Sequence, residues 1–419
     1  MASTDQDSDI VLPCSILDTD LYKFTMQQAV LKHFSHVQAS YRFTNRDKAR
    51  SFSRACFDRL KASVAHFSDL VLAPAERAWL ARACSYFTPT YLDFLSSYRF
   101  DPAQVHIAFI PRADSADEGD IEIDVTGPWV ETILWEVPLM ATLSEIFFLT
   151  DDMDWDMAGQ DDLAFAKAER LLAHGCIVSE FGTRRRRSYA VQDVVVSQMK
   201  RAHSAQSAGR GKLAGTSNAY LAYRHDLTPI GTIAHEWFMG VAALTGYEGA
   251  NGRAMDLWEA VYPDVLLIAL TDTFSTKAFF DDFAKDVERA RRWRGLRQDS
   301  GDPHAFAPAA KAVYDALGID SREKTIIYSD ALDVDKALEL QAQCSALGFN
   351  ASFGIGTFLT NDFCKVSDSA QKSKALNIVI KVAEVDGRPC VKISDDLLKN
   401  TGDAETVDKV KDMYGLPKA

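Results

Sequence analysis

A histidine stands directly after an apolar run, in the segment Gly231-Thr-Ile-Ala-His-Glu236. Its imidazole can act as a base or a nucleophile when a partner holds one ring nitrogen and leaves the other free. Asp272 ends another apolar run and is a candidate for that partner, because a carboxylate accepts a hydrogen bond and so fixes the tautomer. The pair predicts a catalytic His235 oriented by Asp272. The alternative is a histidine that is only packed at the end of a strand.

A turn rich in carboxylates follows a later apolar run, in the segment Arg297-Gln-Asp-Ser-Gly-Asp302. Asp299 and Asp302 are suited to hold ribose hydroxyls or a hydrated Mg²⁺, and Arg297 offers two parallel N–H donors to a carboxylate or phosphate. The segment therefore predicts a sugar phosphate site. The alternative is a polar turn with carboxylates on the surface.

Two glycines lie one residue apart in the segment Phe353-Gly-Ile-Gly-Thr357. Gly354 and Gly356 would let backbone N–H groups approach an anion, Thr357 adds a hydroxyl, and a following helix would add positive potential. The segment resembles a phosphate-binding loop. A single Gly-x-Gly is, however, more often an ordinary turn.

Four consecutive arginines, 184–187, form the most basic run of the chain and raise the question of nucleic-acid binding. The net charge of −13 repels a polyanion on average, and no aromatic residues alternate with the arginines to stack on bases. We therefore expect no nucleic-acid substrate. One arginine should face a pocket, with the others solvated or paired.

The elements that must position these residues follow a repeated pattern of apolar run, polar cluster and helical segment. In a parallel α/β barrel the carboxyl ends of all strands face one rim, so clusters that are distant in sequence converge there. The pattern predicts an irregular parallel α/β barrel of about seven βα units over residues 151–357, with helices over 277–293 and 333–347. The seven expected strands are 177–180, 212–214, 229–233, 265–270, 294–296, 325–328 and 351–353.

The remaining residues, 1–150 and 358–419, predict a discontinuous α+β domain built from both ends of the chain. The turn pair Asp386-Gly387 separates two alternating segments, 376–385 and 389–394, as in a β-hairpin. Pro138 is expected to interrupt a long apolar helix. The other expected elements are helices over 21–34, 75–87 and 130–149, strands over 105–111 and 121–126, and a flexible loop over 204–211.

Composition limits the class of protein. The 419 residues are 47% hydrophobic and 25% charged, enough to bury a large core. Seven cysteines without Cys-x-x-Cys spacing indicate reduced thiols rather than a disulfide or zinc framework. No apolar run approaches the length of a membrane span, and the acidic N-terminus is unlike a signal peptide. We expect a cytoplasmic protein without a membrane partner, with a nuclear location left open.

Two other classes of function fit the pattern less well. A metal-dependent aldolase or hydrolase would need a compact His/Asp/Glu set, and the spacing of the nine histidines does not provide one. Mg²⁺ is therefore expected to arrive with a substrate, near Asp299 and Asp302. A barrel that only binds partners would be expected to have lost His235 or this carboxylate pair.

Nine motifs together resemble the nicotinate phosphoribosyltransferases in their fungal and bacterial form, a family of type II phosphoribosyltransferases. The likeness runs in order from about residue 12 to the end of the chain. The motifs lie at residues 18–26, 127–131, 180–184, 215–218, 231–236, 270–273, 297–302, 328–330 and 353–357.

The resemblance implies a reaction in which nicotinate attacks phosphoribosyl pyrophosphate and yields nicotinate mononucleotide and pyrophosphate, in the Preiss–Handler route of NAD salvage. It implies ATP as a co-substrate and Mg²⁺, with ATP hydrolysis coupled through phosphorylation of His235 beside Asp272. It also implies a homodimer whose partner supplies a tyrosine and an arginine. The implied nicotinate contacts are Tyr22, Phe181, Arg184, Ser217, Thr232 and Arg297. The implied phosphoribosyl pyrophosphate contacts are Arg46, Asp299, Asp330, Gly354, Gly356 and Thr357.

Ser217 bears on the choice between acid and amide. The related nicotinamide phosphoribosyltransferases carry an aspartate there, which would accept from an amide NH₂ and repel a carboxylate, whereas serine can donate to the acid. Quinolinate, a diacid, should need a more basic pocket and is a weaker candidate. Lys381 and Lys392 on the last hairpin are more simply interpreted as solvated strand lysines than as phosphate ligands.

Overall fold

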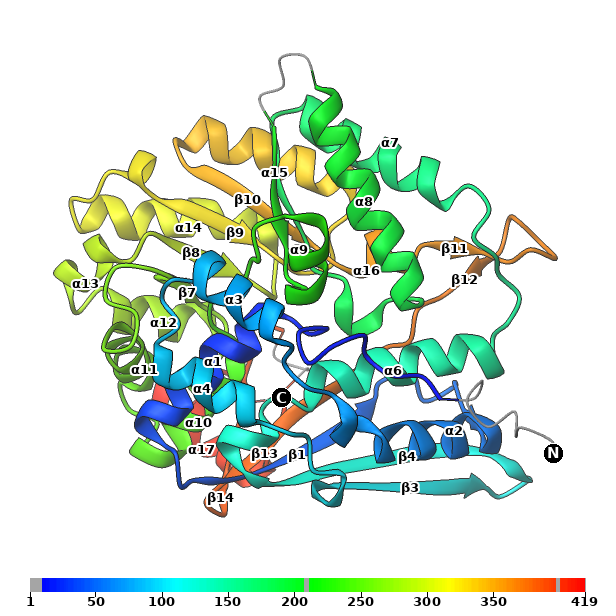
Figure 1. The fold of residues 1–419 in the computed structure, drawn as a ribbon. Helices are drawn as coiled ribbons and strands as arrows, with labels where there is room; N and C mark the ends of the chain where they lie inside the picture. The colour runs from blue at the N-terminus through cyan, green and yellow to red at the C-terminus, as the bar shows by residue number, and fades with distance from the viewer. Residues whose placement is uncertain (1–9, 207–210, 397–399, 419) are drawn as a thin grey trace, which may run out of the picture.

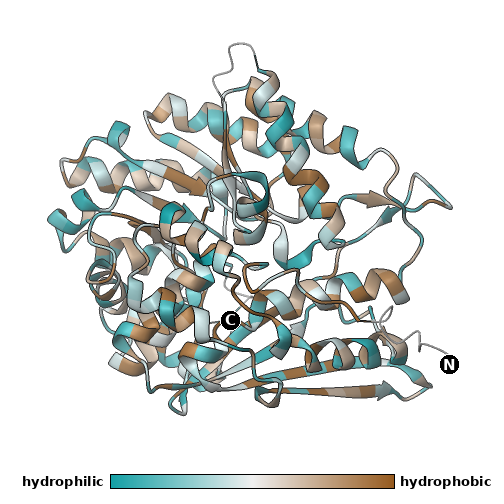
Figure 2. Ribbon diagram, in the orientation of Figure 1, coloured by the Kyte–Doolittle hydropathy of each residue, from teal (hydrophilic) through white to brown (hydrophobic). Residues whose placement is uncertain are grey.

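The structure, a computed structural model, describes residues 10–206, 211–396 and 400–418. It contains a parallel sheet flanked by helices and an antiparallel sheet, drawn in the upper and lower halves of Figure 1. Buried apolar residues of both halves form one continuous cluster. The outer helices carry both brown and teal residues in Figure 2, as expected for elements with one buried face.

The six strands of the parallel sheet follow the order β6-β5-β10-β9-β8-β7, and every neighbouring pair is parallel. Their carboxyl ends therefore lie at one edge, and the polar segments after them meet there. This confirms the predicted convergence. The strands are β5 (Ile177–Glu180), β6 (Lys212–Thr216), β7 (Ile268–Leu270), β8 (Gly295–Gln298), β9 (Thr325–Tyr328) and β10 (Asn350–Ile355).

The seventh expected strand, 229–233, does not form, so the prediction of seven strands was wrong. Pro229 makes only an isolated bridge with Thr216, and a proline has no backbone N–H to donate to a ladder. The carbonyl of Ile233 instead accepts a hydrogen bond from Nη1 of Arg297, at 3.1 Å. The parallel ladder of the described residues ends at β6 and β7, and a closed barrel is not confirmed.

Helices connect these strands. Asp333 accepts from the N–H of Lys336 at 2.8 Å and begins the expected helix, α15. The segment 277–293 forms two helices rather than one, because Asp286 adopts an extended conformation and caps the second. The helices are α7 (Gln160–Ala173), α8 (Tyr189–Ala205), α9 (Ala219–His225), α10 (His235–Thr245), α11 (Ala250–Glu259), α12 (Thr276–Phe283), α13 (Val287–Arg292), α14 (Pro303–Ala316), α15 (Val334–Leu347) and α16 (Thr357–Thr360). Of the expected loop 204–211, residues 207–210 lie outside the described residues.

The antiparallel sheet joins the two ends of the chain. Strand β13 pairs with β1, which pairs in turn with β4, and the pairing Phe43↔Ile380 illustrates the register. This confirms that N- and C-terminal segments share a sheet, although the domain limits at residues 150 and 357 remain a prediction. The strands are β1 (Gln38–Asn45), β2 (Phe52–Ser53), β3 (Val105–Arg112), β4 (Ser115–Pro128), β13 (Ile378–Val385) and β14 (Arg388–Pro389).

The last hairpin is shorter than predicted. Asp386 and Gly387 form its turn with positive φ angles of 46° and 68°, as the sequence indicated. The second strand ends at Pro389, and the following residues leave the sheet. The N–H of Ile393 then donates to the carbonyl of Thr273 at 2.8 Å. This departure brings residues 392–395 to the carboxyl edge of the parallel sheet.

The long apolar segment forms α5 (Trp129–Thr132) and α6 (Glu136–Thr150). The break falls at residues 133–135 rather than at Pro138, which lies in the first turn of α6, where no N–H is needed. Contrary to our expectation, Trp129–Thr150 is long and apolar enough by composition to cross a membrane, but 83% of its window is buried inside the protein. It is therefore the central helix of the core. The other elements are α1 (Leu21–His33), α2 (Arg54–Ala65), α3 (Pro74–Ala83), α4 (Pro89–Ser97), β11 (Phe363–Cys364), β12 (Lys372–Ser373) and α17 (Ala404–Tyr414).

Candidate active site

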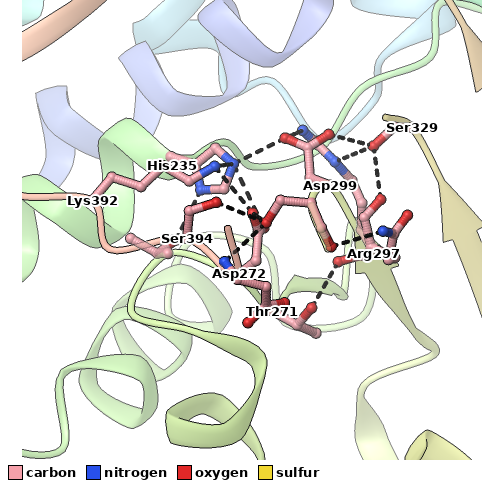
Figure 3. Close-up of polar contacts among 12 residues, drawn as sticks. His235, Thr271, Asp272, Arg297, Asp299, Ser329, Lys392 and Ser394 are labelled. Carbon is pink, nitrogen blue, oxygen red and sulfur yellow. Dashed lines mark hydrogen bonds and ion pairs between the residues drawn. The ribbon is translucent and has the colours of Figure 1, made fainter. Parts of the chain in front are cut away.

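His235 is the first residue of α10 and lies among side chains from three other segments (Figure 3). Its Nδ1 is 3.1 Å from Oγ1 of Thr273, which follows β7. Its Nε2 is 2.9 Å from Oδ2 of Asp299, which follows β8. Only 18% of the imidazole side chain is exposed. The ring is thus held at both nitrogens and still opens to the edge of the sheet.

Asp272 also lies beside the ring, but it is not the closest carboxylate. Its Oδ1 is 3.6 Å from Nε2 of His235. Its Oδ2 accepts from Oγ of Ser300 at 2.6 Å. The contact that we predicted for Asp272 is therefore made by Asp299, and Thr273 holds the other nitrogen. No sequence pattern distinguishes which of these neighbouring side chains lies closer to the imidazole.

Lys392 is the residue of this site that the sequence interpretation missed. Its Nζ lies 3.0 Å from Nε2 of His235 and 3.0 Å from Oδ2 of Asp272, and the residue is only 8% exposed. The prediction of a solvated strand lysine was wrong, because the chain leaves the sheet before this point. The sequence carried no signal of this burial, because Val391 and Ile393 alternate with Lys392 as in a strand whose lysine faces solvent.

Lys381 is likewise not a solvated lysine. It is half-buried on β13, and its Nζ donates to Oγ1 of Thr401 at 2.7 Å. Burial, Lys392 and Arg46 together lower its pKa to about 7. Lys381, Lys392 and Arg46 are thus electrostatic neighbours, and of these Lys392 contacts His235.

The two partners of Nε2 make opposite demands. The carboxylate of Asp299 can only accept, so it needs a proton on Nε2, whereas a charged Lys392 can only donate and needs the lone pair there. The hydroxyl of Thr273 can serve either tautomer at Nδ1. Burial and Lys392 lower the pKa of His235, against the two aspartates. A neutral imidazole with one free lone pair is therefore favoured.

Asp299 stays ionised in this environment. Burial alone would raise its pKa, but Arg297, His235 and Lys392 hold the pKa well below the ordinary value. Its Oδ1 accepts from Oγ of Ser329 at 2.6 Å, and Nε of Arg297 donates to the same hydroxyl at 3.0 Å. Arg297 is therefore partly engaged within the protein. These bonds join the ends of β8 and β9.

Phe181 explains the two glycines of the predicted phosphate loop. A Cβ on Gly354 would lie 2.3 Å from ring carbons of Phe181, and a Cβ on Gly356 would lie 2.8 Å from its carbonyl oxygen. Close packing thus requires both glycines, a reason that the sequence pattern did not reveal. The half-exposed Thr357 begins α16, a helix of four residues, so its terminal dipole is weak.

Arg184 faces the same region from the other side. Its side chain is 45% exposed, and Nη1 lies 3.5 Å from Oε1 of Glu136. Tyr22, Glu136 and Asp20 raise the pKa of Arg184 above its usual value, against burial. Burial has the largest effect on Arg46 and lowers its pKa, and the charge of Arg184 lowers it further. The exposed Asp330 raises the pKa of Arg46 in part. Tyr22 and Arg46 are therefore electrostatic neighbours of Arg184 within one chain.

Ser217 and Thr232 lie deeper than expected. The Ser217 hydroxyl donates to Oδ1 of Asp20 at 2.7 Å, and the residue is 4% exposed. The carbonyl of Thr232 accepts from Oγ1 of Thr25 at 2.6 Å, which fastens the loop before His235 to α1. Burial raises the pKa of Asp20, although Arg184 and the hydrogen bonds from Ser217 and Thr183 oppose it. The serine hydroxyl is thus committed to a carboxylate of the protein.

Comparison with known proteins decides the family. The nicotinate phosphoribosyltransferase (NAPRTase) N-terminal domain matches residues 17–144, and the nicotinate phosphoribosyltransferase (NAPRTase) family matches residues 176–418. The chain belongs to the nicotinate phosphoribosyltransferase family. This confirms the resemblance carried by the nine motifs, and with it the expectation of an enzyme.

Other members of the nicotinate phosphoribosyltransferase family match over nearly their whole length. A probable nicotinate phosphoribosyltransferase of Schizosaccharomyces pombe is 41% identical over 97% of this chain and 98% of its own. A nicotinate phosphoribosyltransferase of Methanosarcina mazei is 40% identical over 94% and 96%. The crystal structure of a putative nicotinate phosphoribosyltransferase from Saccharomyces cerevisiae superimposes with a TM-score of 0.92 at 38% identity, covering 96% and 98%. The mixed α/β fold is thereby supported.

Asp302 and two of the four consecutive arginines make contacts within the protein. Asp302 caps α14 by accepting from the N–H of His304 at 2.9 Å. The prediction that its carboxylate acts together with that of Asp299 was therefore wrong. Arg186 is buried and makes two hydrogen bonds to Asp18, at 2.7 and 2.8 Å. Arg187 is fully buried, with its guanidinium 3.6 Å above the ring of Phe148. The expected pairing is thus confirmed for Arg186 and Arg187, whereas the pocket role of Arg184 stays a prediction.

Proposed function

We propose that this protein transfers the phosphoribosyl group of phosphoribosyl pyrophosphate to the ring nitrogen of nicotinate, with release of pyrophosphate. The observation that carries the proposal is the position of His235 between Asp299, Thr273 and Lys392, at the sheet edge where polar segments of separate strands meet. The names of the relatives support the choice of substrates.

The charges of the site suit this reaction. The transition state gains positive charge on the ribose while pyrophosphate leaves with negative charge, so carboxylates should lie near the sugar and cations near the phosphates. Asp299 is an ionised carboxylate, and Arg46, Lys381 and Lys392 supply the cations. Phe181 over Gly354 offers an aromatic face for the pyridine, and Arg184 offers a guanidinium for its carboxylate.

His235 is proposed to couple ATP hydrolysis to the transfer. A lone pair of the imidazole attacks the γ-phosphorus of ATP, an N–P bond forms, and the bond to ADP breaks. Water later cleaves the N–P bond and releases phosphate. The N-terminus of the eleven-residue α10 and the ammonium of Lys392 favour negative charge at this place. The lowered pKa of His235 keeps the attacking lone pair available at neutral pH.

The side chains around His235 show whether the site fits Mg²⁺. Ligand atoms of His235, Asp272 and Asp299 lie within 4.8 Å of one another, a grouping that the fold creates and that sequence spacing did not predict. Oδ1 of Asp272 is fully buried and has no hydrogen-bond partner within residues 10–206, 211–396 and 400–418. Lys392 opposes a second cation on two of the three residues. The donors therefore fit a Mg²⁺ held by one or two carboxylates, with substrate phosphates supplying most ligands and the ion neutralising their charge.

Several parts of the proposal extend beyond the pocket. A role in the Preiss–Handler route, a cytoplasmic location with the nucleus open, the absence of a membrane partner and a homodimer remain predictions. The sharing of the pocket between two subunits, with Tyr22 and Arg46 acting across the interface, also remains a prediction.

The experiment uses nicotinate, phosphoribosyl pyrophosphate, Mg²⁺ and γ-labelled ATP with the intact protein. Nicotinate mononucleotide should form, together with an acid-labile label on His235. His235→Ala should lose both the label and the coupling of ATP hydrolysis to product. Product from quinolinate with release of CO₂, and none from nicotinate, would refute the substrate assignment. Coupled turnover by His235→Ala would refute the phosphohistidine.

A further inference from the structure

A lysine lies in the core between two glutamates that border the proposed pocket. Lys23, on α1, is 0% exposed. Its Nζ lies 2.6 Å from Oε2 of Glu136 and 2.6 Å from Oε2 of Glu236. A buried ammonium is costly unless paired, and here two carboxylates raise its pKa against burial. No step of the proposed reaction uses Lys23 or its contacts with the two glutamates.

Glu236 ties this lysine to the catalytic helix. It follows His235 in the first turn of α10, and its Oε1 accepts from Nε1 of Trp129 at 2.9 Å and from the hydroxyl of Tyr41. Both oxygens of Glu236 are therefore engaged by buried partners. The start of α10 is fixed to α1, α5 and β1 through this one side chain.

Glu136 ties the same lysine to the pocket. It is the first residue of α6, and its second oxygen lies 3.5 Å from Nη1 of Arg184, compared with 2.6 Å to Lys23. Lys23 is therefore the closer cationic partner of the Glu136 carboxylate. Arg184 is left with one long contact to Glu136 and a side chain that is 45% exposed.

We propose that Lys23 is a positioning residue that keeps Arg184 available for the carboxylate of the pyridine substrate, by holding Glu136 away from it. The inference rests on the proposed function, in which Arg184 binds that carboxylate. Without the ammonium, the buried Glu136 would have Arg184 as its remaining cationic partner among the described contacts. A guanidinium and a carboxylate then close into two parallel hydrogen bonds, and the substrate loses its anchor.

The test measures KM for nicotinate, KM for phosphoribosyl pyrophosphate, kcat and melting temperature. Lys23→Met should raise the KM for nicotinate by about tenfold or more, while the KM for phosphoribosyl pyrophosphate changes by less than about threefold. Lys23→Met combined with Glu136→Gln should restore the KM for nicotinate to within about threefold of the native value, because no carboxylate remains to capture Arg184. A lysine with a merely structural role would lower stability and kcat without this selective effect.

Lys324→Met is the matched control. Lys324 is also buried, at 3% exposed, but its Nζ donates to three backbone carbonyls, and it precedes β9, at the opposite end of the strand from the pocket. It should lower the melting temperature and leave both KM values unchanged. If Lys23→Met does not fold, Glu136→Gln alone decides: the KM for nicotinate should stay the same or fall, and a tenfold rise overturns the proposal.

The possible failures can be distinguished. A native protein that makes no nicotinate mononucleotide refutes the proposed function. Native activity together with an unchanged KM for nicotinate in Lys23→Met refutes only the positioning role of Lys23. Equal rises in both KM values refute it as well, because they indicate a general loss of structure.

Discussion

Nζ of Lys392 lies 3.0 Å from Nε2 of His235, and the two residues come from opposite parts of the architecture. The histidine begins a helix of the parallel sheet region, whereas the lysine follows the last hairpin of the antiparallel sheet. The contact places a positive charge beside the group that we propose to be phosphorylated. It also links the electrostatics of His235 to the correct folding of the chain's C-terminal part.

Removing that charge should change the pH dependence. Lys392 lowers the pKa of His235, so Lys392→Met should raise it. Because the unprotonated imidazole is the attacking form, the acidic limb of the rate of His235 phosphorylation should move to higher pH. The measurement is the initial rate of label incorporation between pH 5 and 8. An acidic limb at the native position would contradict this assignment of charge.

Asp299 and Asp302 should behave differently, although they are three residues apart. Asp299→Asn removes the negative charge beside Nε2 of His235 and should lower kcat by about 100-fold. Asp302→Asn changes a helix cap and should cost at most about 1 kcal/mol of stability, with kcat nearly unchanged. Steady-state kinetics and thermal unfolding of both variants make the comparison. Equal losses of kcat would restore the paired-carboxylate interpretation.

Gly354→Ala should move the ring of Phe181, because the added Cβ would lie 2.3 Å from two of its carbons. We expect a loss of about 1–3 kcal/mol of stability and a higher KM for nicotinate. Gly252→Ala is the control, since its Cβ would meet only the flexible end of Arg289, at 3.1 Å. A Gly354→Ala variant with native kinetics would show that the position of Phe181 is not needed.

Ser217→Asp should reduce the use of nicotinate more than the use of nicotinamide. The structure adds a second consequence, because the new carboxylate would face Asp20, to which the native hydroxyl donates at 2.7 Å. Ser217→Ala removes the same hydrogen bond without adding charge and serves as the control. kcat/KM for both substrates is the measurement. Equal losses on the acid and the amide would remove the argument for selectivity at this position.

Mixing two inactive variants tests whether the pocket is shared between subunits. If Arg46 acted from a partner subunit, Arg46→Ala mixed with His235→Ala would regain part of the native activity through mixed dimers. Because the family resemblance implies a shared pocket, we expect partial recovery, and its absence would show that Arg46 beside Arg184 in the same chain completes the site. The mixture must be unfolded and refolded together so that subunits can exchange. Restored turnover would show that the site is completed in trans.

The sequence predicted the elements that depend on local pattern and failed where distant segments decide. Apolar runs with polar ends located six of the strands, and the clusters after them do converge. The run 229–233 has the same pattern, but Pro229 and the hydrogen bond from Arg297 to Ile233 keep it out of the sheet. Pro229 is a local signal against a strand, whereas the hydrogen bond from Arg297 cannot be read from the sequence.

The same limit applies to the site. His235 and Asp299 were found from their own motifs, because each lies in a polar cluster after an apolar run. In a parallel sheet such clusters meet at one edge. Lys392 was misjudged because its environment depends on where β14 ends. Lys23 attracted no attention in the sequence, since its importance arises only from two glutamates that are distant along the chain.

The pairing of β13 with β1 has a consequence for biosynthesis. β13 is among the last segments to leave the ribosome, and until then β1 presents unpaired backbone groups along one side, the kind of bare edge that recruits other chains. The ammonium beside His235 arrives just after it. A polypeptide cut short before residue 378 would lack both the partner of β1 and Lys392 beside His235, so we expect such products to aggregate and to be inactive.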